Sequence, residues 1–162
     1  LSTYLASQGW ELYSDETAII DLNTSLVLPI YRPAALKNES IQIIKRYFPD
    51  SHFSPTTEGT QKGAIAHVMP RSKAHYSQLS PMPVKFVVLP KYSRLQKNLD
   101  IISLTKAQTA VKCINNSFNY GILGEAGFNS LYNVISSADG FTVKFSELDQ
   151  VASFLDYLIE ER

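Results

Sequence analysis

The chain has 162 residues, of which 44% are hydrophobic and 19% are charged, and its 15 basic and 15 acidic residues balance at neutral pH. This composition excludes a disordered chain, and the length suits one folded domain with a buried core. Zero net charge gives no general attraction to nucleic acid or to an anionic membrane surface, so neither is expected as a partner.

The number of cysteines and the length of the apolar runs limit the expected cellular location. Cys113 is the single cysteine, so an internal disulfide is impossible and a reducing, cytoplasmic setting is expected. No apolar run approaches the roughly 20 residues that a membrane-spanning helix needs. We therefore expect a cytoplasmic protein without a membrane partner.

Sequence periodicity predicts alternating helices and strands. In chain order we expect a helix over 1–9, strands over 10–14 and 17–22, an extended segment over 25–40, a helix over 40–48, a mobile loop over 50–62, a strand over 63–69, a loop over 71–83, strands over 84–90 and 99–105, helices over 106–114 and 124–136, a strand over 141–145 and a helix over 146–161. The strand over 84–90 is the most hydrophobic and is predicted to be buried. The uneven rhythm indicates an α/β or α+β fold.

The last helix has the clearest pattern. Ser146 and Asp149 are spaced as an N-terminal cap. Its expected buried stripe comprises Leu148, Val151, Leu155 and Leu158 or Ile159.

Two adjacent carboxylates follow the predicted strand at 10–14, in the turn Ser14-Asp15-Glu16. An acidic residue at a strand end often holds Mg²⁺ in nucleotide-binding folds, because this cation prefers oxygen ligands. A neighbouring carboxylate can accept a proton from an attacking hydroxyl. Taken alone, however, the pair is more typical of a solvated turn than of a metal site.

Further stretches occur in one order and spacing around this turn: GWELYSDE (9–16), LKNESI (36–41), KGAIAHV (62–68), VVLPKY (87–92) and FNYGILGE (118–125). The series resembles the HPr serine kinase-like family, and most closely its HPr kinase-related branch. The resemblance covers about residues 1–125 well and the last helix loosely.

The resemblance implies that 1–162 is a single domain with the mixed-sheet P-loop kinase core of HPr kinase and phosphoenolpyruvate carboxykinase. In that family a Gly-rich phosphate-binding loop precedes the helix that corresponds to 1–9, so the loop is expected directly before Leu1 and the chain is expected to be truncated at its N-terminus. The implied activity is ATP-dependent, Mg²⁺-assisted phosphoryl transfer to a hydroxyl of a protein or small molecule. Without its loop the chain itself is expected to be inactive. HPr kinases are hexameric, but the elements behind that assembly are not recognisable in this sequence, so the oligomeric state, a homo-oligomer included, stays open.

The acidic turn matches the paired acids of the family. Asp15 lies at the position that binds Mg²⁺. Glu16 lies at the second position, where HPr kinases commonly have an Asp that acts as the base. Glu is longer by one methylene, which weakens this assignment.

Two further motifs carry the implied nucleotide contacts. Lys37, Asn38 and Glu39 match a motif of the related branch, for which contact with nucleotide, metal or substrate is expected. Lys62 and Gly63 lie where HPr kinases have Arg-Gly before a strand, so a cation is retained without bidentate geometry.

Structural alternatives remain open for several residues. Glu39 can be an acid favoured by the helix dipole. His67, within an apolar strand, is more typical of a core histidine. Cys113 is expected in the core, and the short basic segment from Arg71 to His75 as a solvated loop that can otherwise meet phosphate or an acidic partner.

A second function class also remains open. The chain can be a non-catalytic binding or regulatory module that keeps the kinase-like fold and binds a partner through the segments 50–62 and 71–83. A third alternative is that the paired acids bind a divalent ion for structural reasons alone.

Overall fold

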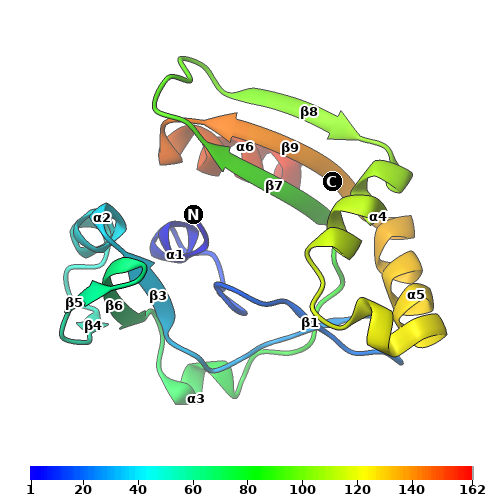
Figure 1. Cartoon of the computed structure of the whole chain (residues 1–162), viewed down its shortest axis with the longest axis horizontal. Coiled ribbons are helices and arrows are strands. Elements are labelled where there is room, and N and C mark those ends of the chain that lie inside the picture. Colours follow the sequence, from blue (N-terminus) through cyan, green and yellow to red (C-terminus); the bar gives the residue numbers. More distant parts are fainter. Residues whose placement is uncertain (162) are drawn as a thin grey trace. The chain divides into compact units, whose positions relative to one another are not determined.

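The computed structural model describes residues 1–161, which form six helices and nine strands in separate sheets (Figure 1). The fold is therefore mixed, and the α+β alternative is the one observed. Within this described part no helix is long and apolar enough to cross a membrane.

The chain divides into two compact units. Unit 1 comprises Leu1–Ile19 and Leu28–Pro81, and unit 2 comprises Ile20–Val27 and the chain from Met82 onward. The short strands β1 (Ile19–Ile20) and β2 (Val27–Leu28) pair with each other where the sequence passes between units. That both units belong to one kinase-like domain stays a prediction.

Unit 1 is built around the strand β6 (Gly63–Met69), which pairs antiparallel with its neighbours. These are β3 (Ala34–Lys37), β4 (His52–Phe53) and β5 (Thr57–Thr60). Alternate residues of β6 point to opposite faces, so Ala66 and Val68 are fully buried whereas His67 is exposed. The core position considered for His67 is therefore wrong.

Two helices add buried side chains to the unit 1 core. They are α1 (Ser2–Ser7) and α2 (Glu39–Tyr47). The residues Ile41 and Ile44 are one turn apart on α2 and both are buried, which confirms the predicted apolar spacing. Tyr4 of α1 packs edge to face against Tyr47 of α2, with 4.7 Å between ring centroids.

Unit 2 contains a three-stranded sheet in the order β7-β9-β8. Its strands are β7 (Phe86–Tyr92), β8 (Asp100–Leu104) and β9 (Asp139–Phe145). The central strand β9 runs parallel to β7 and antiparallel to β8. Because β7 is an edge strand, it is half-buried over its first four residues and exposed over its last three, so the prediction of a buried strand here is wrong.

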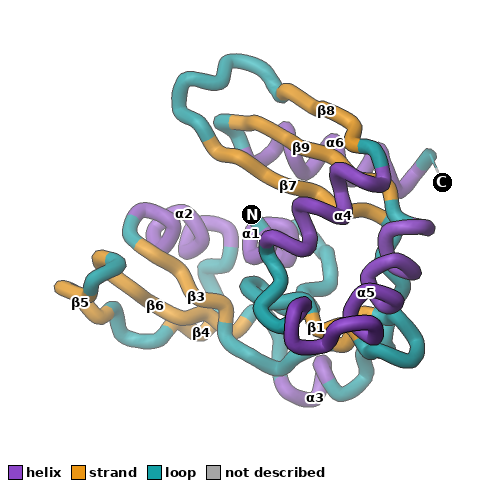
Figure 2. The backbone as a smooth tube through the Cα atoms, turned by 45° about the vertical axis from the view of Figure 1, so that its right-hand side comes forward, coloured by secondary structure: helices purple, strands orange, loops and turns teal. Residues whose placement is uncertain are grey.

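Three helices complete unit 2: α4 (Lys106–Asn115), α5 (Tyr120–Ser137) and α6 (Leu148–Glu160). Phe154 of α6 packs edge to face on Phe141 of β9, with 5.7 Å between ring centroids. Helices α4 and α5 follow each other as a hairpin (Figure 2). The predicted helices, and the strands at 63–69, 99–105 and 141–145, are confirmed apart from their ends.

Helix caps differ from the sequence prediction. Thr105 and Gln108 form a capping box at the start of α4, which satisfies two backbone amides. At α6 the N-cap is Glu147 and no side chain caps the helix, so the predicted cap of Ser146 is wrong. On the predicted stripe of α6, Val151 and Leu155 are buried but Ile159 is 51% exposed.

Four segments were assigned wrongly from sequence. The segment 10–14 forms no strand, and only Ile19–Ile20 of 17–22 does. Segment 50–62 contains β4 and β5 instead of being a loop, and segment 71–83 contains the short helix α3 (Lys73–Tyr76). The segment 50–62 forms strands because it pairs with β6, and such tertiary contacts decide whether a polar segment becomes a strand.

Candidate functional site

The predicted metal residue Asp15 is engaged by backbone. Ser14 Oγ accepts weak hydrogen bonds from the N–H groups of Glu16 and Thr17, at 3.4 and 3.2 Å, which shapes the turn. Asp15 Oδ2 accepts a hydrogen bond of 2.7 Å from the N–H of Ala35 in β3. One oxygen of the carboxylate is thus used to hold β3, and Oδ1 is the oxygen suited to a cation.

This contact belongs to a pattern along β3. The N–H of Asn38 donates to Ala64 O at 2.9 Å. In this antiparallel register the backbone N–H groups of Asn38, Leu36 and Ala34 therefore face β6. The amides of Ala35 and Lys37 face the other way, where Asp15 Oδ2 and Ser40 Oγ accept their protons at 2.7 and 2.8 Å. Two side chains therefore satisfy the open edge of β3, which protects an edge strand from pairing with another chain.

Glu16, the predicted base, forms an ion pair with Arg32. The distance from Glu16 Oε2 to Arg32 Nη2 is 3.1 Å, and the two side chains are 46% and 55% exposed. A pair this exposed contributes at most about 1 kcal/mol. Glu16 can therefore exchange Arg32 for another partner at low cost.

The predicted nucleotide motifs at 37–39 and 62–63 are brought together by Asn38. Its Oδ1 accepts from the N–H of Ala64 at 3.1 Å, and its Nδ2 makes a long contact of 3.4 Å with Lys62 O. Asn38 has a positive φ of 50° and Gly63 one of 83°. A Cβ at position 63 would overlap the Asn38 side chain, so glycine is needed both for its φ and for this close approach.

Lys37, Glu39 and Lys62 have exposed side chains. They lie where Asn38 contacts the segment 62–64. Lys37 ends β3 and Glu39 begins α2. The acidic turn meets β3 at Ala35, near its start. The structure thus places the predicted site residues at the two ends of one short strand.

A further polar pair in unit 1 was missed from sequence. His75 Nε2 lies 2.7 Å from Glu11 Oε2, and Tyr13 Oη donates to Ser80 O at 2.6 Å. These contacts attach segment 71–81 to the segment that leads into the acidic turn. No spacing signal reveals them, because each pair is more than 60 residues apart in sequence.

Tyr76 lies beside this pair and is buried. Burial raises the pKa of Tyr76, and the negative charges of Glu11 and Asp15 raise it further, against an opposing effect of Arg71. Its ring packs edge to face on Tyr31, with 5.5 Å between centroids. Glu11 and Asp15 therefore act electrostatically on one tyrosine.

Unit 2 contains a hollow that no sequence motif indicates. It lies between α4 and α5 and has a volume of about 480 Å³. It is lined by Lys106, Ala107, Ala110, Ile114, Tyr120, Phe128, Leu131, Tyr132, Ile135 and Ser136. The lining is chiefly apolar, as is typical of a site for an apolar partner.

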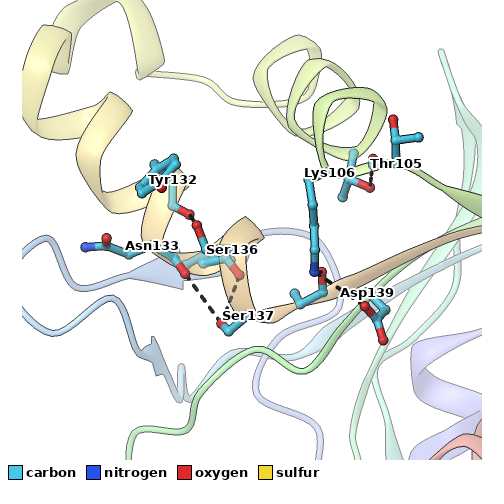
Figure 3. Close-up of polar contacts among 10 residues, drawn as sticks. Thr105, Lys106, Tyr132, Asn133, Ser136, Ser137 and Asp139 are labelled. Carbon is cyan, nitrogen blue, oxygen red and sulfur yellow. Dashed lines mark hydrogen bonds and ion pairs between the residues drawn. The ribbon is translucent and has the colours of Figure 1, made fainter.

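Two polar side chains that line this hollow, Lys106 and Ser136, make contacts within unit 2 (Figure 3). Lys106 Nζ donates to Ala138 O at 2.6 Å and lies 3.4 Å from Asp139 Oδ1. The Oγ of Ser136 donates to Tyr132 O at 2.7 Å. Lys106 is therefore neutralised locally by Asp139.

The residues present fit Mg²⁺ in part. Among residues 1–161 no group of three or more His, Cys, Asp or Glu side chains is placed to hold a metal ion. Mg²⁺ bound together with a nucleotide needs only one or two carboxylates, because phosphate oxygens and waters complete its shell. Asp15, oriented by the N–H of Ala35, offers one ligand of the right chemistry.

Comparison of the chain with family models, with curated proteins and with solved structures returns no match.

Proposed function

We propose that the chain belongs to an ATP-dependent phosphotransferase of the HPr kinase-related type, with a P-loop kinase core, acting in the cytoplasm on a hydroxyl of a protein or small molecule. The observation that carries the proposal is the convergence of two motifs 24 residues apart, held together by the side chain of Asn38. The family resemblance implies nucleotide contact for both motifs independently of their proximity.

In this proposal Lys37 and Lys62 supply positive charge to the phosphates, and Asn38 and Gly63 shape the backbone between them. Lys37 and Lys62 are exposed, so their ammonium groups can reach a bound anion. Glu39 then lies at the margin of the site. In the family that the sequence resembles, the main phosphate cradle is a Gly-rich loop before the helix that corresponds to 1–9.

Asp15 would hold Mg²⁺ through Oδ1 while Oδ2 stays on the N–H of Ala35. Glu16 would leave Arg32 and accept the proton of the acceptor hydroxyl. The hydroxyl oxygen would then bond to the γ-phosphorus while the bond from that phosphorus to the bridging oxygen breaks, and ADP would leave with that oxygen. Positioning and charge neutralisation provide most of the rate enhancement in such transfers.

The test is a calorimetric titration with Mg-ATP of the protein extended to its natural start. Replacing Lys37 or Lys62 by Ala should weaken binding about tenfold, since a charge-assisted hydrogen bond is worth about 1.5 kcal/mol or more. The matched control is Lys97→Ala, another exposed lysine, in unit 2. Unchanged affinity for Mg-ATP in both variants would contradict the proposed contact of Lys37 and Lys62 with the phosphates.

A second candidate is the non-catalytic module with a kinase-like fold. It is favoured by the engagement of both acids, Asp15 with Ala35 and Glu16 with Arg32. Absence of Mg-ATP binding by the extended protein would support this candidate over the kinase. Stabilisation by Mg²⁺ alone, seen as a higher melting temperature without a nucleotide effect, would instead indicate a structural ion.

A further inference from the structure

Hydrogen bonds at the two ends of β9 show which way its backbone groups point. The N–H of Asp139 donates to Lys85 O at 2.9 Å. At the other end, Phe145 O accepts a hydrogen bond of 2.9 Å from the N–H of Ser93. Lys85 and Ser93 lie directly before and after β7, so the odd-numbered residues of β9 face β7. Successive residues of a strand point their N–H and C=O groups to opposite sides, and the even-numbered residues of β9 therefore face β8.

The register between β8 and β9 then shows which backbone groups of β8 are open. Asp100, Ile102 and Leu104 are opposite even-numbered residues of β9, so their N–H and C=O groups form the ladder between the two strands. The N–H and C=O groups of Ile101 and Ser103 point to the outer side, where no further strand lies in the described part of the chain (Figure 1). The side chains of Ile101 and Ile102 are 39% and 49% exposed. The outer side of β8 is therefore an open edge with apolar side chains on both faces.

Two other edge strands are closed by devices that β8 lacks. On β7 the even-numbered residues face outward by the same argument, and Pro90 has no N–H to offer there. On β3, Asp15 and Ser40 accept the protons of the outward amides. The strand β8 contains no Pro or Lys, and its outer side is closed after the strand, where the N–H of Thr105 donates to Gln108 Oε1 at 2.9 Å. An edge strand without such devices is a template for another strand.

The charges around β8 indicate which kind of strand it can accept. From Lys91 to Lys106 the chain carries four basic residues and one acidic residue. The acid, Asp100, is paired with Lys144 at 3.5 Å, while Lys97, three residues before the strand, is exposed. Antiparallel pairing of β8 with a second copy would bring the loop that contains Lys97 in each copy to Lys106 at the end of the other strand. This repulsion disfavours a second copy and favours a segment with acidic side chains.

We propose that the outer edge of β8 binds an extended segment of a partner protein as a fourth strand of the unit 2 sheet. The segment pairs with the N–H and C=O groups of Ile101 and Ser103, and it carries apolar side chains beside them. Its acidic side chains lie beside Lys97. Strand addition of this kind takes its affinity from main-chain hydrogen bonds and its specificity from alternate side chains. The proposal does not depend on the kinase activity.

The test is a fluorescence anisotropy titration of the whole 162-residue chain against a fluorescein-labelled peptide of sequence VTVTVEEE. Antiparallel addition places the C-terminal acids of this peptide at the start of β8, beside Lys97. Binding with a dissociation constant on the order of 100 μM or tighter is expected. The peptide VTVTVKKK should bind at least about tenfold more weakly, because it meets the basic loop with like charge.

Two pairs of variants test the backbone and the charge separately. Ser103→Pro removes an N–H that faces away from β9, so the ladder inside the sheet is kept and binding should weaken at least about tenfold. Its matched control is Ser103→Ala, which retains the N–H and should bind as the wild type does. Lys97→Glu should weaken binding of VTVTVEEE, whereas Lys112→Glu, at an exposed position of α4, should not.

Far-ultraviolet circular dichroism establishes that each variant folds. Should Ser103→Pro disturb the fold, VTVTVEEE methylated on its valine nitrogens or on its threonine nitrogens blocks one side of the peptide at a time, and one of the two should lose binding to the wild-type chain. No change in anisotropy up to about 1 mM protein overturns the proposal, as that excludes specific binding of useful strength. Equal affinity for both peptides, or affinity that neither Ser103→Pro nor methylation reduces, overturns it as well. A dimer in sedimentation equilibrium that Ser103→Pro dissociates would make a second copy the occupant and would equally overturn it.

Discussion

Replacing Asp15 in two ways separates its structural role from its proposed metal role. Asp15→Ala removes the acceptor for the N–H of Ala35, which lies 2.7 Å from Oδ2. A hydrogen bond to a charged group contributes about 1.5–3 kcal/mol when buried. Both residues are half-buried, so solvent partly replaces the carboxylate and we expect a loss of about 1–2 kcal/mol. Asp15→Asn keeps an acceptor oxygen and should lose less than about 1 kcal/mol.

The assay is urea unfolding followed by tryptophan fluorescence. Trp10 is the single tryptophan and lies in unit 1, so its signal reports on the unit that contains the changed residue. Amide hydrogen exchange at Ala35 provides a local readout, since the unprotected N–H should exchange faster in Asp15→Ala. The control is Asp50→Asn, at an exposed position of the same unit.

The result that would refute the reasoning is an Asp15→Ala variant with wild-type stability and unchanged exchange at Ala35. The hydrogen bond would then contribute nothing. The same pair of variants also tests the metal role in the extended protein. Asp15→Asn should stay folded and lose Mg-dependent nucleotide affinity, because an amide is a poorer Mg²⁺ ligand than a carboxylate.

Three other changes give distinct expected outcomes. Gly63→Ala should destabilise unit 1 by about 1–3 kcal/mol, because the new Cβ meets both a positive φ and the side chain of Asn38. Gly59→Ala, at a φ of 71° with nothing within 4 Å, is the control, and equal losses in urea unfolding would refute the contact. Glu16→Gln should change stability by less than about 1 kcal/mol, since its ion pair is exposed; a larger loss would contradict this. Burial raises the pKa of the Cys113 thiol above its ordinary value; alkylation, which requires the thiolate, should therefore be slower at pH 8 in the folded than in the unfolded chain, and equal rates would contradict the burial.

Regular elements were predictable where the local pattern and the tertiary environment agree. The apolar spacing of Ile41 and Ile44 predicts α2, and the alternation in GAIAHVM predicts β6 with the observed bounds. The prediction failed over 10–14 and 50–62, where strand formation depends on a partner. Polar β5 is a strand because it pairs with β6, whereas apolar 10–14 has no such ladder.

For the candidate site, too, the sequence predicts some features and the tertiary structure adds others. The sequence by itself determined which residues are chemically competent: the acids at 15 and 16, the cations at 37 and 62, and the glycine at 63. It also determined the helices other than α3 and the central strands β6 and β9, because periodic burial needs no distant partner. The proximity of the motifs at 37–39 and 62–63 came from the β3–β6 register and from Asn38, which no local pattern encodes.

Only the tertiary structure decided the Asp15–Ala35 hydrogen bond at the edge of β3, the Glu11–His75 contact and the hollow between α4 and α5. Each joins residues whose separation in sequence carries no periodic signal. Hydrogen bonds and cavities depend on distances of a few ångströms between atoms of different elements. Composition and spacing specify the elements with a periodic pattern, but packing alone fixes those distances.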